Sequence, residues 1–456
     1  MKATFLLASA LTLSLAILVG GCQPPQTSTT DSKKLLVSAE PTSFKEVTAQ
    51  LDPGGNFYLY LGTEQCLQGL SAKVAHWRQL ADIIPNVQSN DRENIGRVFD
   101  VVTNLINDSG LEEISGFGVS AIATDKGFYR TKALLHHYKG KGSGFGWGLL
   151  GQKPHALDGL GMLPANTALA AFSDLDVSLF WSVLQKEVAK SDFPPAQQFL
   201  QQLPEQFENA THVKWDQVLA SLGGEFGVIV TLDNSRMVAV PLPNQKGPLE
   251  IPEPALMFVA KVKDDTIFNR IDEALKSTGQ NIISNDKPGL KMRTLPVPLP
   301  IPIQVRPTVA TAGGYLFIAS TDALVQEALA VKAGQKPGLK STDEFRRLSA
   351  GVPEQGNQFS FLSQRLGQTL VQVQRQALQM SPNTAQAELL QSLLVSSNGA
   401  CSYTVGLNTD EGRLSVANGN QHPAKVFMAG AAVPIAVLTA VAVPAFVKAR
   451  QAAQRK

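Results

Sequence analysis

The sequence predicts an α+β fold made of repeated units, each with a strand, one or more helices and then a hairpin. Two recurring patterns support this prediction. Apolar strands lead through Ser, Thr or Asp into helical runs, and strands that begin near glycine end at an Asp turn. Units of this kind pack antiparallel or mixed sheets against helices. We also expect one transmembrane helix near the C-terminus.

The strand–helix pattern occurs four times. Strands are expected at 57–61, 167–172, 255–262 and 315–319, with helical runs that extend to about residues 80, 188, 275 and 329. Ser, Thr and Asp at these joints can accept hydrogen bonds from the first N–H groups of a helix. In the third run, apolar residues share one helical face: Ile267, Phe268, Ile271 and Leu275.

The hairpin pattern occurs three times, and each time it follows a helical stretch. Its strands cover about 114–125, 223–233 and 399–410, and each ends at an Asp. The turns Asp125-Lys126-Gly127 and Asp410-Glu411-Gly412 have the composition of hairpin turns. The strand, helix and hairpin unit is therefore expected three times along the chain.

The N-terminal residues have the pattern of an export signal, which we expect to cover 1–21. A basic Lys2 precedes an apolar run at 5–19, which is too short for a stable membrane span. The string Val19-Gly20-Gly21-Cys22 resembles a bacterial lipoprotein processing site, and this resemblance implies cleavage before Cys22 and lipidation of its thiol. The alternative is an ordinary secretory signal. Residues 23–34 contain no apolar side chain that could enter a core, and residues 22–40 are expected to form a flexible tether.

The C-terminal residues indicate a membrane span. Residues 426–447 carry no charge, and about 33 Å of helix at 1.5 Å per residue is enough to cross a bilayer core. A basic tail at 448–456 is expected on the cytoplasmic side. A buried core helix is the alternative. The string from Ala442 to Arg450 weakly resembles the helix of type IV pilins and pseudopilins, which carry that helix at their N-terminus instead.

Three short motifs resemble a family of exported bacterial proteins known only as a domain of unknown function. They begin at Leu163, Gly223 and Gly313, with the sequences LPANTAL, GGEFG and GGYLFIAS. The resemblance implies location and fold but no chemistry. The expected organisation is a signal (1–21), a tether (22–40), three α+β units (41–155, 156–250 and 251–424), a transmembrane helix (425–447) and a tail (448–456).

Two further features have open interpretations. A glycine-rich loop at 140–151 contains Phe145 and Trp147, and it is either a mobile linker or a loop that offers these rings to a sugar, peptide or lipid surface. Cys66 and Cys401 are either a disulfide between the first and last units or two buried thiols.

The sequence contains no recognisable catalytic or metal-binding motif. The histidines lack ligand spacing, and we expect His136 and His137 to point to opposite faces of a strand. A net charge of +2 gives no support for binding nucleic acid, and no cofactor is expected. The leading hypothesis is a non-catalytic binding or scaffolding module, anchored to the membrane and located outside the cytoplasm, with an envelope protein or polymer as its partner. The alternatives are an envelope hydrolase acting on peptidoglycan or peptide, and an accessory component of secretion or pilus machinery.

Overall fold

A computed structural model describes residues 42–79, 89–125, 127–191, 193–240, 249–296, 305–380, 399–422 and 424. The predicted signal, Cys22, the tether, the transmembrane helix and the basic tail lie outside these residues. Among the helices that the structure does describe, none is long and apolar enough to cross a bilayer.

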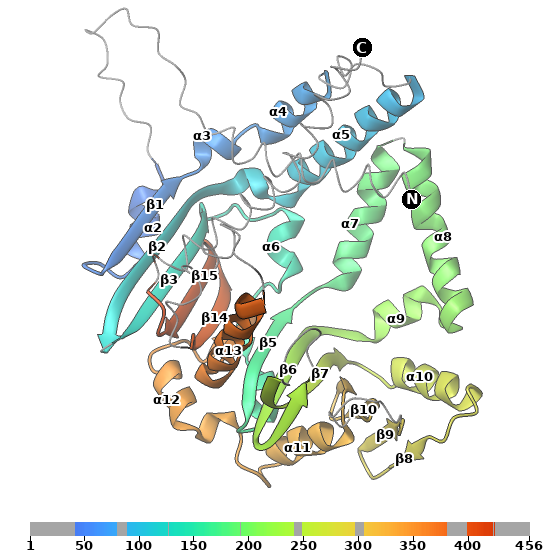
Figure 1. The fold of residues 1–456 in the computed structure, drawn as a ribbon. Helices are drawn as coiled ribbons and strands as arrows, with labels where there is room; N and C mark the ends of the chain where they lie inside the picture. The colour runs from blue at the N-terminus through green and yellow to red at the C-terminus, as the bar shows by residue number, and fades with distance from the viewer. Residues whose placement is uncertain are drawn as a thin grey trace, which may run out of the picture.

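One large antiparallel sheet runs through the described part of the chain (Figure 1). Its 13 strands have the order β1-β2-β3-β15-β14-β13-β5-β6-β7-β11-β10-β9-β8. A second sheet pairs only β12 (Gln355–Gly356) with β4 (His155–Ala156). The fold is therefore α+β, and the sheet is antiparallel rather than mixed.

A strand, one or more helices and then a hairpin occur three times among the described residues, but the second hairpin strand continues past the predicted Asp233 turn to Val240, and the strand that opens the last unit was not predicted. The first unit contains β1 (Phe57–Gly62), α3 (Glu64–Leu67), α4 (Leu70–Trp77), α5 (Ser89–Ser109), β2 (Ile114–Asp125) and β3 (Phe128–His137). The second contains β5 (Thr167–Asp174), α7 (Val177–Lys190), α8 (Pro194–Thr211), α9 (Trp215–Ser221), β6 (Leu222–Val240) and β7 (Leu249–Val262). The last contains β13 (Gln358–Leu362), α13 (Gln364–Met380), β14 (Ser402–Thr409) and β15 (Gly412–Gly419).

The last unit in sequence is the middle unit in space. Strand β15 pairs with β3 of the first unit, and β13 pairs with β5 of the second (Figure 1). The sheet is completed by β11 (Tyr315–Ala319), β10 (Thr308–Ala312), β9 (Leu290–Thr294) and β8 (Ile283–Ser284). One continuous sheet thus joins strands from all three segments that the sequence divided at residues 155 and 250.

The remaining helices are short; α2 precedes the first strand, and the others follow strands or connect them. They are α2 (Phe44–Ala49), α6 (Phe145–Leu149), α10 (Thr266–Ser277), α11 (Asp322–Lys332) and α12 (Asp343–Ser349), with single 3₁₀ turns at Leu111–Glu113, Asp158–Met162 and Leu339–Ser341. Two of the expected joints form side-chain caps. Asp176 accepts a hydrogen bond from the N–H of Leu179 at 2.8 Å, and Thr321 accepts one from that of Leu324 at 3.3 Å.

The main core lies between one face of the sheet and helices α11 and α12. Alternation along β13 shows how the sequence produces it: Phe359 and Phe361 are buried, whereas Gln358 and Ser360 are exposed. The core also contains Ile229, Met257, Phe317, Val325, Phe345 and Leu348. On the opposite face of the sheet, α10 packs against Val262, Val309 and Leu316, whereas Phe258 and Ile318 are about half exposed.

Candidate functional site

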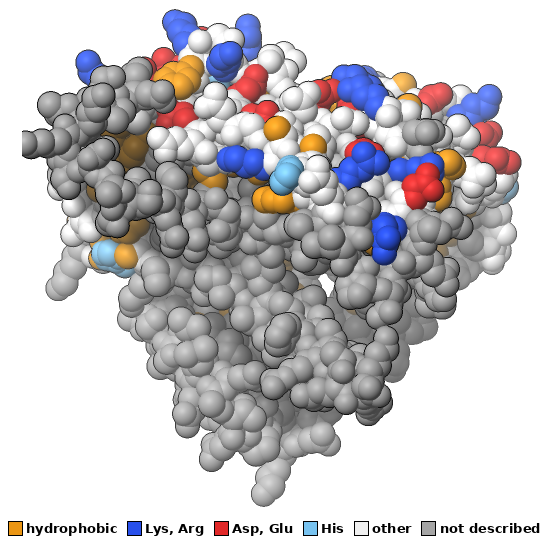
Figure 2. All heavy atoms as spheres, turned by 90° about the horizontal axis from the view of Figure 1, so that it is seen from above, with side chains coloured by type: hydrophobic (Ala, Val, Ile, Leu, Met, Phe, Trp, Pro, Cys, Tyr) orange, Lys and Arg blue, Asp and Glu red, His pale blue; other side chains and the backbone are white. Residues whose placement is uncertain are grey.

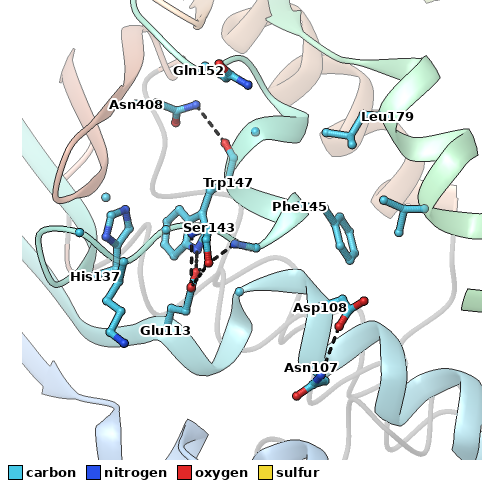
Figure 3. A pocket seen from close by; sticks show the side chains of 18 of the residues that line it. Asn107, Asp108, Glu113, His137, Ser143, Phe145, Trp147, Gln152, Leu179 and Asn408 are labelled. Atoms are coloured by element: carbon cyan, nitrogen blue, oxygen red, sulfur yellow. Dashed lines mark hydrogen bonds between the residues drawn. The ribbon is translucent and has the colours of Figure 1, made fainter. Parts of the chain in front are cut away.

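The glycine-rich loop predicted at 140–151 borders a large groove between α5, α6 and α7. The groove has a volume of about 1220 Å³. Side chains that line it come from four distant parts of the sequence: Asn107, Asp108, Glu113, His137, Phe145, Trp147, Gln152, Leu179, Lys186 and Asn408 (Figure 3). Both aromatic residues singled out in the sequence lie here, and their role in ligand binding remains a prediction.

Glu113 holds the loop in one conformation. Its Oε1 atom accepts hydrogen bonds from the backbone N–H and the hydroxyl of Ser143, at 3.3 and 2.9 Å. Its Oε2 atom accepts from the N–H of Gly144 at 3.3 Å and from Nε1 of Trp147 at 2.9 Å. Burial acts to raise the pKa of Glu113, but these bonds outweigh it and lower the pKa below its usual value. In the structure the loop is therefore built around a carboxylate that accepts four hydrogen bonds from it.

Two glycines allow the loop to approach its neighbours this closely. A Cβ atom at Gly110 would lie 2.5 Å from Nε1 of Trp147 and 2.6 Å from Oε2 of Glu113, so any side chain there would break their bond. A Cβ atom at Gly142 would lie 2.5 Å from the ring of His137. Both glycines also have positive φ angles, of 82° and 85°.

The two aromatic rings have different surroundings. Trp147 contacts three neighbouring side chains. Besides its hydrogen bond to Glu113, its ring packs edge-on against His137 with 4.5 Å between the ring centroids, and the guanidinium carbon of Arg413 lies 5.9 Å from its ring centroid. The Phe145 ring instead points into the space between α5 and α7, near Asp108 and Leu179 (Figure 3). Phe145 is thus the ring that a molecule in the groove would meet.

An ion-pair network fixes α5 against α7 on the far wall of the groove. Lys186 and Lys190 each place Nζ 2.9 Å from Oδ2 of Asp108, and Lys190 also lies 3.0 Å from Oε1 of the fully buried Glu187. The bonds from both lysines lower the pKa of Asp108 far below its usual range. The two lysines on this wall therefore offset the charges of the two carboxylates.

Two amide side chains, Asn357 and Asn408, hold the segment that forms the near wall. Asn357, which is 4% exposed, donates to the carbonyl of Lys153 at 2.9 Å and to Oδ2 of Asp174 at 3.1 Å, and its Oδ1 accepts from the N–H of Asn408 at 2.9 Å. Asn408 in turn donates to the carbonyl of Gly151, and Arg413 donates to that of Gly146 at 2.6 Å. The last unit thus supports the loop of the first.

The histidine pair occupies two environments, as predicted. His136 lies within hydrogen-bonding distance of the Ser115 hydroxyl, with Nδ1 at 2.7 Å, whereas His137 packs on Trp147 in the groove. In the part of the chain that the structure describes, no group of three His, Cys, Asp or Glu residues could hold a metal ion.

Cys401 is a free thiol in the structure and is 2% exposed, so a bond between Cys66 and Cys401 is not present. Burial raises the pKa of the Cys401 thiol to about 11. Cys401 packs in the main core, close to the aromatic residues of β13 and β14. The expected link between the first and last units is instead made by the pairing of β3 with β15.

Charges of both signs are interspersed on one face of the molecule. On the face that Figure 2 shows, basic and acidic side chains lie next to one another among the coloured residues. This arrangement matches the net charge of +2 and gives no extended field of one sign across the coloured residues of that face.

Comparison with known proteins supplies a family but no activity. No curated protein and no solved structure matches the chain. The family described as "Protein of unknown function (DUF3352)" matches residues 150–406, which is more than half of the chain and includes the strands from β5 to β13. This match agrees with the resemblance found in the three sequence motifs, all of which lie within it. The chain therefore belongs to the DUF3352 family of proteins of unknown function.

Proposed function

We propose that this protein is a non-catalytic binding module of the cell envelope, anchored to the membrane, and that its ligand lies in the groove beside Phe145. One observation carries the proposal: an ordered loop, held by Glu113, presents an aromatic ring to a groove of about 1220 Å³. Sites for ligands are usually concave and largely pre-formed, with a few placed polar groups and aromatic side chains. The groove together with the loop of 140–151 meets these criteria, because it is concave and lined by polar groups and the ring of Phe145.

The engagement of the charged groups supports binding rather than catalysis. The pKa values of Asp108 and Glu113 are both lowered, so each carboxylate stays ionised at neutral pH and neither is suited to act as a general acid. His137 packs against Trp147 and is only 5% exposed. The groove therefore offers fixed hydrogen-bonding groups rather than a proton donor beside an acceptor.

The envelope location rests on the sequence. A lipid on Cys22 and a helix at 425–447 would attach one chain at two points and leave the residues between them outside the cytoplasm. A binding module at the membrane surface would have an envelope protein or polymer within reach. The balanced charge of the chain is consistent with a partner other than a nucleic acid.

Co-sedimentation of the detergent-solubilised full chain with isolated cell-wall and envelope fractions tests this function. We expect Phe145→Ala to reduce co-sedimentation and Phe145→Tyr, which keeps the ring, to retain it. Phe199→Ala is the matched control, because that ring is 58% exposed on α8 and does not line the groove. Equal sedimentation of wild type and Phe145→Ala, with unchanged thermal unfolding, would contradict the proposal.

A further inference from the structure

A second cavity adjoins the groove at the ends of strands β5 and β6. This strand-end cleft has a volume of about 610 Å³, and Gly148 and Gln152 line both cavities. Its other lining residues include His155, Asp158, Glu225 and Lys261. The segment 148–152 is therefore a shared wall, and the two cavities adjoin along it.

The cleft places Lys261 between two carboxylates without direct hydrogen bonds. Its Nζ lies 3.8 Å from Oδ2 of Asp158 and 3.9 Å from Oε2 of Glu225, both longer than a hydrogen bond. The buried Glu225 also accepts a hydrogen bond from the hydroxyl of Tyr315 at 3.1 Å. Polar atoms at such separations are commonly bridged by an oxygen that bonds to both. This part of the cleft thus suits a group that donates and accepts at once.

His155 adds an imidazole ring with two hydrogen-bond acceptors as partners to the same cleft. Its Nδ1 lies 2.8 Å from the carbonyl oxygen of Ala156, and its Nε2 lies 2.9 Å from Oδ2 of Asp174. Because both partners are acceptors, the protonated ring satisfies both contacts. Burial acts to lower the pKa of His155, but these two bonds outweigh it and raise the pKa above its usual value.

The balance of acidic and basic side chains in the strand-end cleft disfavours ligands with a large net charge. Asp158, Asp174, Asp176 and Glu225 face Lys261, Lys263 and His155 around the cleft. A ligand with a large net charge of either sign would approach like charges here. A hydroxyl group, by contrast, carries one donor and two acceptor lone pairs, so it can accept from Lys261 and donate to Asp158 or Glu225.

We propose that the groove and the strand-end cleft form one path for a neutral glycan chain, with a sugar hydroxyl that accepts from Lys261 and donates to either Asp158 or Glu225. The inference rests on the proposed function, because it assigns a ligand class to the same groove. Phe145 offers a flat apolar face to a sugar ring at one end of the path, and the charged groups of the cleft bind hydroxyls at the other. A neutral glycan could come from the cell wall or from an exported polysaccharide.

Calorimetric titration of the full chain in detergent with two neutral hexasaccharides, cellohexaose and hexa-N-acetylchitohexaose, tests the inference. We expect at least one to bind, and a preference for the N-acetylated sugar would indicate the cell wall. Lys261→Met keeps the aliphatic stem that packs on Gly223, and we expect it to weaken binding at least tenfold. Glu225→Gln, which keeps an acceptor for Tyr315, should weaken binding as well. Lys276→Met is the control, since this exposed lysine pairs with Asp272 on α10 away from the cleft.

Thermal unfolding of each variant separates loss of the ligand from loss of the fold. Glycan binding that is unchanged in folded Lys261→Met and Glu225→Gln would overturn the inference, as would the absence of binding by the wild type. If neither sugar binds but Phe145→Ala still reduces co-sedimentation with envelope fractions, the ligand class is wrong and the proposed function stands. If Phe145→Ala changes neither glycan binding nor co-sedimentation with envelope fractions, both the glycan inference and the proposed function fail.

Discussion

Replacing Glu113 with Gln should loosen the loop that carries Phe145 while leaving the rest of the fold intact. The carboxylate accepts four hydrogen bonds, two on each oxygen, from Ser143, Gly144 and Trp147. Gln offers one acceptor oxygen in place of two, so the donors on the other side lose their partner. A hydrogen bond to a charged group contributes about 1.5–3 kcal/mol when it is well formed and buried.

The expected magnitude follows from the geometry. One bond on each oxygen is long, at 3.3 Å, and the Ser143 contacts are exposed to the groove, so we take about 1 kcal/mol for each bond lost. Losing two of them should cost roughly 2 kcal/mol of loop stability, which is about a 30-fold increase in opening. Glu113→Ala removes all four bonds and should cost roughly twice as much.

Hydrogen exchange followed by mass spectrometry measures this opening directly at the amides of Ser143 and Gly144. We expect both to exchange about 30-fold faster in Glu113→Gln, from the loss of about 2 kcal/mol. Glu273→Gln is the matched control, because its side chain is 63% exposed in a helix-surface pair and should change stability by no more than about 0.5 kcal/mol. Exchange in Glu113→Gln that matches this control would refute the role given to Glu113.

The same loop should respond to acid. Because the pKa of Glu113 is lowered in the folded protein, its contribution is present above the unfolded value of about 4.3 and is lost as the pH falls through the folded value. The exchange difference between wild type and Glu113→Gln should therefore shrink toward low pH. A difference that is constant from pH 7 to pH 3 would contradict this explanation.

Four further outcomes are expected. Asn357→Ala should lower the free energy of unfolding by about 2–4 kcal/mol, since it removes three partly buried hydrogen bonds. Urea denaturation measures this change, and an unchanged free energy of unfolding would contradict it. The pKa of His155 is raised in the folded protein, so its pairing with Asp174 stabilises the fold fully below about pH 6.5. This stabilisation is lost as the pH rises through the pKa of the folded state. The difference in unfolding midpoint between wild type and His155→Gln should therefore shrink from pH 6 to pH 9. The Cys401 thiol should resist maleimide in the native protein and react in denaturant, and rapid native labelling that Cys401→Ser abolishes would contradict its burial. Radiolabelled fatty acid should be incorporated into the wild type and not into Cys22→Ala, and an unlabelled wild type would remove the lipid anchor.

Local patterns in the sequence were sufficient for the repeating unit. Alternating apolar residues, Ser, Thr and Asp at helix starts, and turn residues act over fewer than ten residues, so the four strand–helix joints and two of the three hairpin turns could be predicted directly. The caps formed by Asp176 and Thr321 are examples. The order of the units in the sheet could not be read in this way. Pairing of β3 with β15 joins residues that are over 270 positions apart, and no local pattern specifies which hairpins become neighbours.

The site was predicted in part. The glycine run with two aromatic residues identified the loop, but not the carboxylate that orders it. Two signals point to Glu113: a half-buried indole N–H requires an acceptor, and the hairpin turn at 125–127 brings the residues just before β2 opposite those just after β3. Asp108 and Asn408 carried no such signal, because their partners on α7 and in the loop are set by tertiary packing.

The central claim is that a ligand occupies the groove beside Phe145, and in vivo photo-crosslinking tests it most directly. A photoreactive phenylalanine would replace Phe145 in the full chain, and the same group at the exposed Phe199 would serve as the control. We predict a discrete adduct with an envelope protein or polymer from position 145 and none from position 199. Equal adducts from both positions, or none from position 145 in a correctly folded protein, would contradict the account.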